Sequence, residues 1–259
     1  MDMEKGEKYE HPYLNEVIFR IDFSNILKLS GTNKEAAEDF RKKIFERFPN
    51  ATISPQNQET QIEFNKDTGE PIITQTGDLL WTFTNKDKNK VVELKSTNLI
   101  FDYKRGAYTH FRDFLDDIMY LLNGFEIYSP IDLKFLGLRY INQIDGKSIS
   151  ELQECINPLY FDKKVTNLDN DEKFIQTLTR QSTEKEGYLL NFQYGLFNPA
   201  FPNPNFDKDF ILDIDCINKN NILFEELPNE LKHMNHIIWV KFKSSITDKL
   251  DKEMKGEMI

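Results

Sequence analysis

The sequence predicts an α+β protein in which a mixed or antiparallel sheet packs against two to four helices, in an arrangement compatible with two related lobes. Three observations lead to this fold class. Segments that alternate apolar and polar residues outnumber those with a helical apolar stripe, and several follow one another without a helix between them. The length of 259 residues fits a single large α+β unit. The 21 phenylalanines supply aromatic surface for an extensive core.

The chain begins with a strand and a helix. Residues 15–23 alternate strictly, which is typical of a strand with one buried face. Thr32 and Glu35 have the spacing of a capping box, so a helix is expected after them. Pro49 marks the end of this helix, because proline cannot continue it.

Short strands then precede a second helix. The strands are expected at residues 61–64, 79–84, 91–95 and 99–103. The helix begins after Thr109, and Gly124 suits the left-handed position at its C-terminus. The apolar stripes of both helices and of the following strand need a common interior. The residues that we expect in this core are Phe40, Ile44, Phe114, Ile118, Leu136 and Leu138.

Residues 134–144 predict a strand whose two faces differ. One face is apolar, whereas the other carries Arg139 among apolar neighbours. A cation in such surroundings is unfavourable unless a partner or a ligand satisfies it. We therefore expect Arg139 to pair across neighbouring strands with an N-terminal carboxylate, Glu16 or Asp22. The alternative is that Arg139 receives an anion in a pocket.

The rest of the chain supplies further strands and a long terminal helix. Alternation predicts strands at 188–194 and 210–216, and an apolar stripe predicts a helix from Pro228 with a break at Ser244 and Ser245. The domain organisation that we expect is a flexible arm (1–10), an N-terminal α+β lobe (11–145), a connecting segment (146–186) and a C-terminal lobe of strands and helix packed on the first (187–259).

The formal net charge of −10 restricts the classes of function. Nucleic acids and anionic membrane surfaces attract basic proteins, so the charge argues against both and favours a basic protein partner.

No apolar run is long enough to span a membrane, and residues 1–10 lack the apolar core of a signal peptide, so a cytoplasmic location is expected. Cys155 and Cys216 have no metal-binding spacing, and we expect neither a metal nor a cofactor.

Arg139, Asp213 and Asp215 are the candidate catalytic residues. The two aspartates alternate along one predicted strand, so their side chains point to the same side. A carboxylate pair in this arrangement can hold a divalent ion or share a proton. The solvated face of an antiparallel strand has the same pattern.

Lys104, Arg105 and Tyr108 are the candidate ligand-binding residues, because cations interleaved with aromatic rings can neutralise a nucleotide and stack on it. An ordinary basic turn has the same composition. His233 and His236 share one face of the terminal helix, but two imidazoles without a third ligand do not make a metal site.

Four segments together resemble a large prokaryotic family that is known as sporadically distributed and uncharacterised. They are PYLNEVIF (12–19), the strand around Trp81, LRYIN (138–142) and FKSSITDKL (242–250). The resemblance runs from about residue 10 to the C-terminus. It implies a cytoplasmic accessory protein of the kind that often serves in defence or toxin–antitoxin systems, and it implies no catalytic residues.

These expectations favour a non-enzymatic protein-interaction subunit with a basic protein partner, and they leave the oligomeric state open. The P-loop, dinucleotide-binding, nucleophile-elbow and zinc-protease motifs are all absent from the sequence. The alternative is a nucleotide-handling or nucleic-acid-processing enzyme that uses Arg139 with Asp213 and Asp215. A deep pocket in which these groups converge would favour the enzyme, and a shallow surface would favour the interaction subunit.

Overall fold

A single antiparallel sheet dominates the computed structural model, which describes residues 9–64, 71–128, 132–161, 175–203, 208–220 and 222–257. The described strands follow the order β2-β3-β4-β5-β1-β6-β9-β8-β7 across the sheet. Their bounds are β1 Leu14–Phe23, β2 Asn50–Phe64, β3 Pro71–Thr84, β4 Lys90–Leu94, β5 Asn98–Lys104, β6 Leu133–Ile144, β7 Thr177–Lys185, β8 Tyr188–Phe197 and β9 Asp209–Asn218. All neighbouring strands pair antiparallel.

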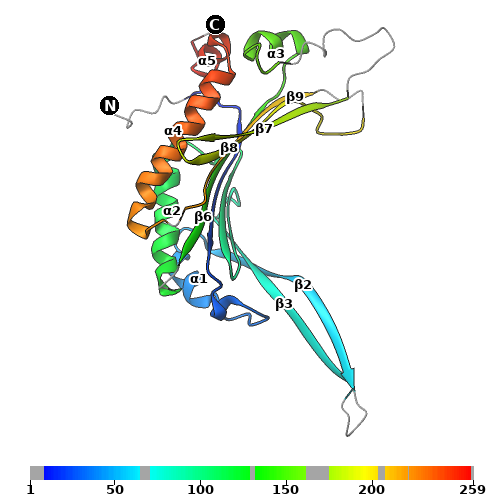
Figure 1. Cartoon of the computed structure of the whole chain (residues 1–259), viewed down its shortest axis with the longest axis vertical. Helices are drawn as coiled ribbons and strands as arrows, with labels where there is room; N and C mark the ends of the chain where they lie inside the picture. Colours follow the sequence, from blue (N-terminus) through cyan, green and yellow to red (C-terminus); the bar gives the residue numbers. More distant parts are fainter. Residues whose placement is uncertain are drawn as a thin grey trace.

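The helices gather along one side of this sheet, and α2 and α4 contact each other there (Figure 1). Their bounds are α1 Glu38–Ile44, α2 Phe111–Phe125, α3 Ile149–Cys155, α4 Leu227–Ser245 and α5 Asp248–Met254. Ser148 caps α3 in a complete capping box. In the described residues, no helix has both the length and the apolar character needed to cross a membrane.

The predicted fold class was wrong in its details. The described chain has five α-helices rather than two to four. Of the two kinds of sheet that the sequence left open, mixed and antiparallel, the structure has the antiparallel one. Two separate lobes are not formed either, because β6 of the expected N-terminal lobe pairs with β9 of the expected C-terminal lobe within one continuous sheet. The order strand, helix, antiparallel strands, helix nevertheless occurs twice along the chain.

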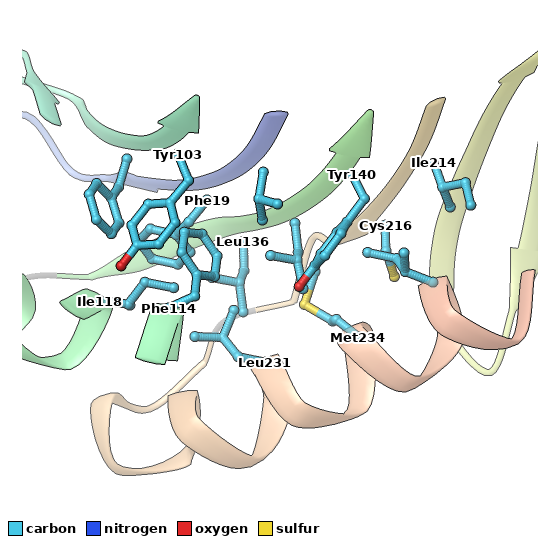
Figure 2. Packing of buried hydrophobic residues seen from close by; sticks show 14 of the residues in the cluster. Phe19, Tyr103, Phe114, Ile118, Leu136, Tyr140, Ile214, Cys216, Leu231 and Met234 are labelled. Carbon is cyan, nitrogen blue, oxygen red and sulfur yellow. The ribbon is translucent and has the colours of Figure 1, made fainter. Parts of the chain in front are cut away.

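The hydrophobic core lies between the helices and the sheet (Figure 2). Phe19 and Tyr103, from neighbouring strands, pack toward Phe114 of α2, and Leu231 and Met234 of α4 cover the strands further along (Figure 2). The predicted core is confirmed, because each of its members is 0% exposed: Phe40, Ile44, Phe114, Ile118, Leu136 and Leu138. The predicted break near Ser244 and Ser245 is also confirmed, since α4 ends at Ser245.

The sequence prediction found only residues 61–64 of strand β2 and missed strand β7. Strand β2 extends from Asn50 and contains Pro55, which a strand at the edge of a sheet tolerates because its outward N–H needs no partner. Strand β7 lies at the other edge, and Leu178 to Glu184 are all exposed, so no apolar alternation marks it.

The predicted domain boundaries stay a prediction. Parts of the expected segments lie outside the described residues. Residues 1–8 of the expected arm and 162–174 of the expected connecting segment are among these. Within the described part of the arm, the Tyr9 hydroxyl donates to Asp251 of α5 at 2.6 Å. The described part of the connecting segment contains α3 and the whole of β7.

Candidate functional site

The face of the sheet opposite the helices is curved, and in Figure 1 it is the concave side, with α2 and α4 on the convex side. We call it the open face. Directly opposite residues of paired strands share a face, so the strand registers define its members. Its charged side chains include Glu16, Arg20 and Asp22 of β1, Glu93 of β4, Asp102 and Lys104 of β5, Arg139 of β6, Asp209, Asp213 and Asp215 of β9, and Arg180 and Glu184 of β7.

Arg139 and Asp213 form a bidentate ion pair across β6 and β9. The Nε atom of Arg139 donates to Oδ1 of Asp213 at 2.8 Å, and Nη2 donates to Oδ2 at 2.6 Å. Asp213 is only 6% exposed, whereas the Arg139 side chain keeps 43% of its surface exposed. The hydrogen bonds to Asp213 raise the pKa of Arg139 above its ordinary value, so the guanidinium stays charged.

The partner predicted for Arg139 was therefore wrong. Strand β1 does lie beside β6, but β9 lies along the other edge of β6 and supplies Asp213. The two expected carboxylates have other cations as partners, namely Lys104 for Glu16 and Arg20 for Asp22. A strand's neighbours depend on pairing between distant segments, and no local pattern in the sequence placed β9 next to β6.

Asp215 belongs to a row of polar side chains that reaches the edge of the sheet. Asn191 of β8 donates through Nδ2 to Oδ2 of Asp215 at 3.1 Å, and Ser182 of β7 donates through Oγ to Oδ1 of Asn191 at 2.7 Å. Burial raises the pKa of Asp215, while the hydrogen bond from Asn191 and the charge of Arg139 partly offset this effect. The structure thus brings the three candidate catalytic residues together on the open face.

An aromatic ring covers the neighbouring part of the open face. A Cβ atom at Gly137 would lie 3.0 Å from the Phe135 ring, so glycine allows the ring to lie across the strand. Arg20, directly opposite Gly137 on β1, places its Cζ atom 5.4 Å from the centre of the same ring. Arg20 also contacts Asp22 through Nε at 2.7 Å. The cation is therefore held by a ring and a carboxylate.

The candidate ligand-binding residues do not come together. Lys104 lies on the open face, where it pairs with carboxylates of β1 and β5. The Arg105 guanidinium instead contacts Asp145 at 2.7 Å. Tyr108 lies on the helix side, with its hydroxyl 3.1 Å from that of Tyr140. This divergence gives no common surface for a nucleotide.

The histidines and cysteines have other contacts. His233 lies 3.1 Å from Glu186, measured from Nε2 to Oε2, and Glu230 accepts a hydrogen bond from Tyr188 at 2.6 Å. Among the residues that the structure describes, no three His, Cys, Asp or Glu side chains gather in a way that could hold a metal ion. Both cysteines are buried free thiols, and burial raises the pKa of Cys216 to about 12, which disfavours its thiolate.

One charged cluster was not anticipated from the sequence. Asp117 of α2 is 6% exposed and accepts hydrogen bonds from Arg47 at 2.5 Å, from Lys90 at 2.7 Å and from the Tyr103 hydroxyl. Burial by itself would raise the pKa of Asp117, but these hydrogen bonds lower it below its ordinary value. The sequence did contain one sign of this cluster. Asp117 directly precedes Ile118, a member of the predicted apolar stripe, and a carboxylate so close to the core needs partners for its charge. The cluster fastens α2 to the sheet.

The charged open-face residues line neither of two cavities found in the described chain. The larger of these two cavities has a volume of about 310 Å³ and lies between α1 and the β2–β3 pair, with Arg41, Ile53 and Trp81 in its wall. The smaller, beside Tyr160 and Tyr194, has a volume of about 10 Å³. Arg139, Asp213 and Asp215 therefore lie outside both of these cavities.

Two comparisons, with models of protein families and with curated proteins, found no match. No family model matches the chain, and no curated protein is similar to it at a significant level. The family resemblance of the four sequence segments therefore stays a prediction.

Proposed function

We propose that this protein is a non-enzymatic protein-interaction subunit that binds a basic partner protein through its open face. The observation that carries the proposal is the charge of this face, where carboxylates outnumber cations. Arg20, Lys104 and Arg139 each pair with a carboxylate of the same face, so their charges are largely neutralised. The carboxylates left over produce an acidic surface, which attracts and orients a partner of opposite charge.

Asp215 is the carboxylate of this surface that we expect to contact a cation of the partner. It is partly buried, its pKa is raised by burial, and among the described side chains it accepts a hydrogen bond from the neutral amide of Asn191. A lysine or arginine of a partner placed beside Asp215 would favour its charged form, so binding and ionisation would support each other. The same reasoning predicts that partner binding weakens as the pH falls and Asp215 becomes protonated.

The contacts of Arg139 support the interaction subunit over the enzyme. A guanidinium that binds an anionic substrate needs its donors free, whereas two donors of Arg139 are directed at Asp213. Arg139 also lies outside the two cavities described above, while catalytic groups usually converge in a concave site. The proposed setting, a cytoplasmic defence or toxin–antitoxin system, rests on the family resemblance alone.

Charge-neutral variants test the proposal. In the open-face variant, Glu16→Gln, Glu93→Gln and Asp215→Asn remove three charges while preserving the shape of each side chain. Wild-type and variant proteins carrying an affinity tag are incubated with lysate of the source cell, and the retained proteins are identified by mass spectrometry. We expect a basic protein that binds the wild type and is lost from the variant, because its cations no longer meet an acidic surface.

A matched control removes three exposed carboxylates elsewhere, with Glu46→Gln, Glu126→Gln and Asp248→Asn. It should retain the partner, and the purified partner should bind wild type more weakly as salt increases. Retention of the same proteins by all three forms would refute the proposal, as would loss from the control and the open-face variant alike.

A further inference from the structure

Strand β7 ends the described sheet with one side unpaired. It pairs with β8 alone, and each residue from Leu178 to Glu184 is exposed. An edge strand of this kind presents backbone N–H and C=O groups to any strand that approaches it. Arg180 and Glu184 form no ion pair within the described ranges, so both charges are available to a neighbour.

The charge pattern of β7 is complementary to itself. When two copies of β7 run antiparallel with Ser182 opposite Ser182 of the partner subunit, Arg180 comes opposite Glu184 of the partner subunit, and the same contact occurs a second time by symmetry. Arg180, Ser182 and Glu184 all project from the open face, since they lie opposite Gln193, Asn191 and Leu189 of β8. Directly opposite side chains on one face interact closely, and opposite charges there are stabilising.

The other pairs in this register are compatible. Gln181 would face Thr183 of the partner subunit, and Thr179 would face Lys185 of the partner subunit. A register centred on Gln181 instead would set Leu178 opposite Glu184 of the partner subunit and would lose both charge pairs. Charges on edge strands commonly prevent association, but in the register centred on Ser182 they attract.

We propose that β7 mediates a symmetric dimer, in which it pairs antiparallel with β7 of a second copy around Ser182. The two sheets then become one, with both open faces on the same side, because the two-fold axis is perpendicular to the sheet. The polar row from Asp215 through Asn191 to Ser182 continues into the corresponding row of the partner subunit. This dimer does not depend on the basic partner proposed above.

Charge reversal provides a specific test. Arg180→Glu alone sets two carboxylates against each other at both symmetric contacts, and Glu184→Arg alone does the same with two cations. Sedimentation of the full chain over a range of concentrations should show a dimer for wild type and a dimer at least about tenfold weaker for each variant. A mixture of the two variants should associate again, because every contact between unlike chains then joins a carboxylate to a guanidinium.

Two further variants complete the test. The double variant Arg180→Glu with Glu184→Arg restores opposite charges within one chain and should dimerise like wild type. Arg112→Glu, at a side chain that is 89% exposed on α2, should leave the dimer unchanged. A monomeric wild type at every concentration would overturn the proposal. Failure of either the mixture or the double variant to restore association would also overturn it.

Discussion

Replacing Arg139 by methionine tests how much the open-face ion pair contributes to stability. Methionine keeps the length and apolar stem of the side chain but removes the guanidinium. The Asp213 carboxylate then stays 6% exposed between β6 and β9 without the cation that holds both its oxygens. An unpaired carboxylate in this position is unfavourable, so the folded state should lose stability.

The contacts and exposures set the size of the effect. Removing one member of a fully buried ion pair costs about 3–5 kcal/mol. The Arg139 side chain is 43% exposed, so water screens the pair. A loss of about 2 kcal/mol is therefore expected, and the melting temperature should fall by roughly 4–8 °C.

Denaturant titration followed by circular dichroism measures this loss, with Arg112→Met as the control because that side chain is 89% exposed. Asp213→Asn and the combination with Arg139→Met complete a double-mutant cycle. The combined variant should be more stable than the sum of the two losses predicts, by about 1–2 kcal/mol, because no charge is left unpaired. A loss below about 0.5 kcal/mol for Arg139→Met, or strictly additive losses, would refute the reasoning.

Other predictions follow from burial and from the pKa shifts. Phe114→Ala should lower the free energy of unfolding by about 3–5 kcal/mol in a urea titration, because Phe114 is 0% exposed, whereas Phe45→Ala, at a residue that is 54% exposed, should cost less than about 1 kcal/mol. Burial raises the pKa of Asp251, but hydrogen bonds from lysine and tyrosine neighbours lower it to about 2, below its ordinary 3.8. The ionised carboxylate of Asp251 therefore stabilises the fold fully above pH 3.8, and this stabilisation is lost as the pH falls through about 2. Asp251→Asn should cost about 1–2 kcal/mol near neutral pH and almost nothing in strong acid. Cys216, whose pKa burial raises to about 12, should resist iodoacetamide near neutral pH until denaturant is added, as mass spectrometry would detect; rapid alkylation of the folded protein would contradict its burial.

Local periodicity predicted which side chains of a single strand or helix are buried and which point away from the core. Leu136 and Leu138 are buried and Arg139 projects from the other face, because side chains alternate in any strand. The same reasoning could not find β7, since an edge strand exposed on both faces needs no apolar alternation. It also could not choose Asp213 as the partner of Arg139, because the choice depends on which distant strand lies beside β6.

The sequence singled out the residues of the candidate site but did not predict how they contact one another. Arg139, Asp213 and Asp215 were singled out as charged residues of two predicted strands, and the structure places them within one part of the open face. Their role in an ion pair follows from the bidentate contact, which no sequence spacing encodes. Asp117 was overlooked because its three donors come from separate segments of the chain.

The central position of β1 imposes an order on the folding process. The pairing of β1 with β5 joins segments of the N-terminal half of the chain. The pairing of β1 with β6 instead requires a strand that follows α2, and β6 also pairs with β9 near the end of the chain. Contacts between segments so distant in sequence form slowly. Until β6 arrives, β1 is an edge with unpaired backbone groups, and such an intermediate is prone to aggregate. Pulsed hydrogen exchange during refolding should therefore find that the β1 amides directed at β5 gain protection before those directed at β6.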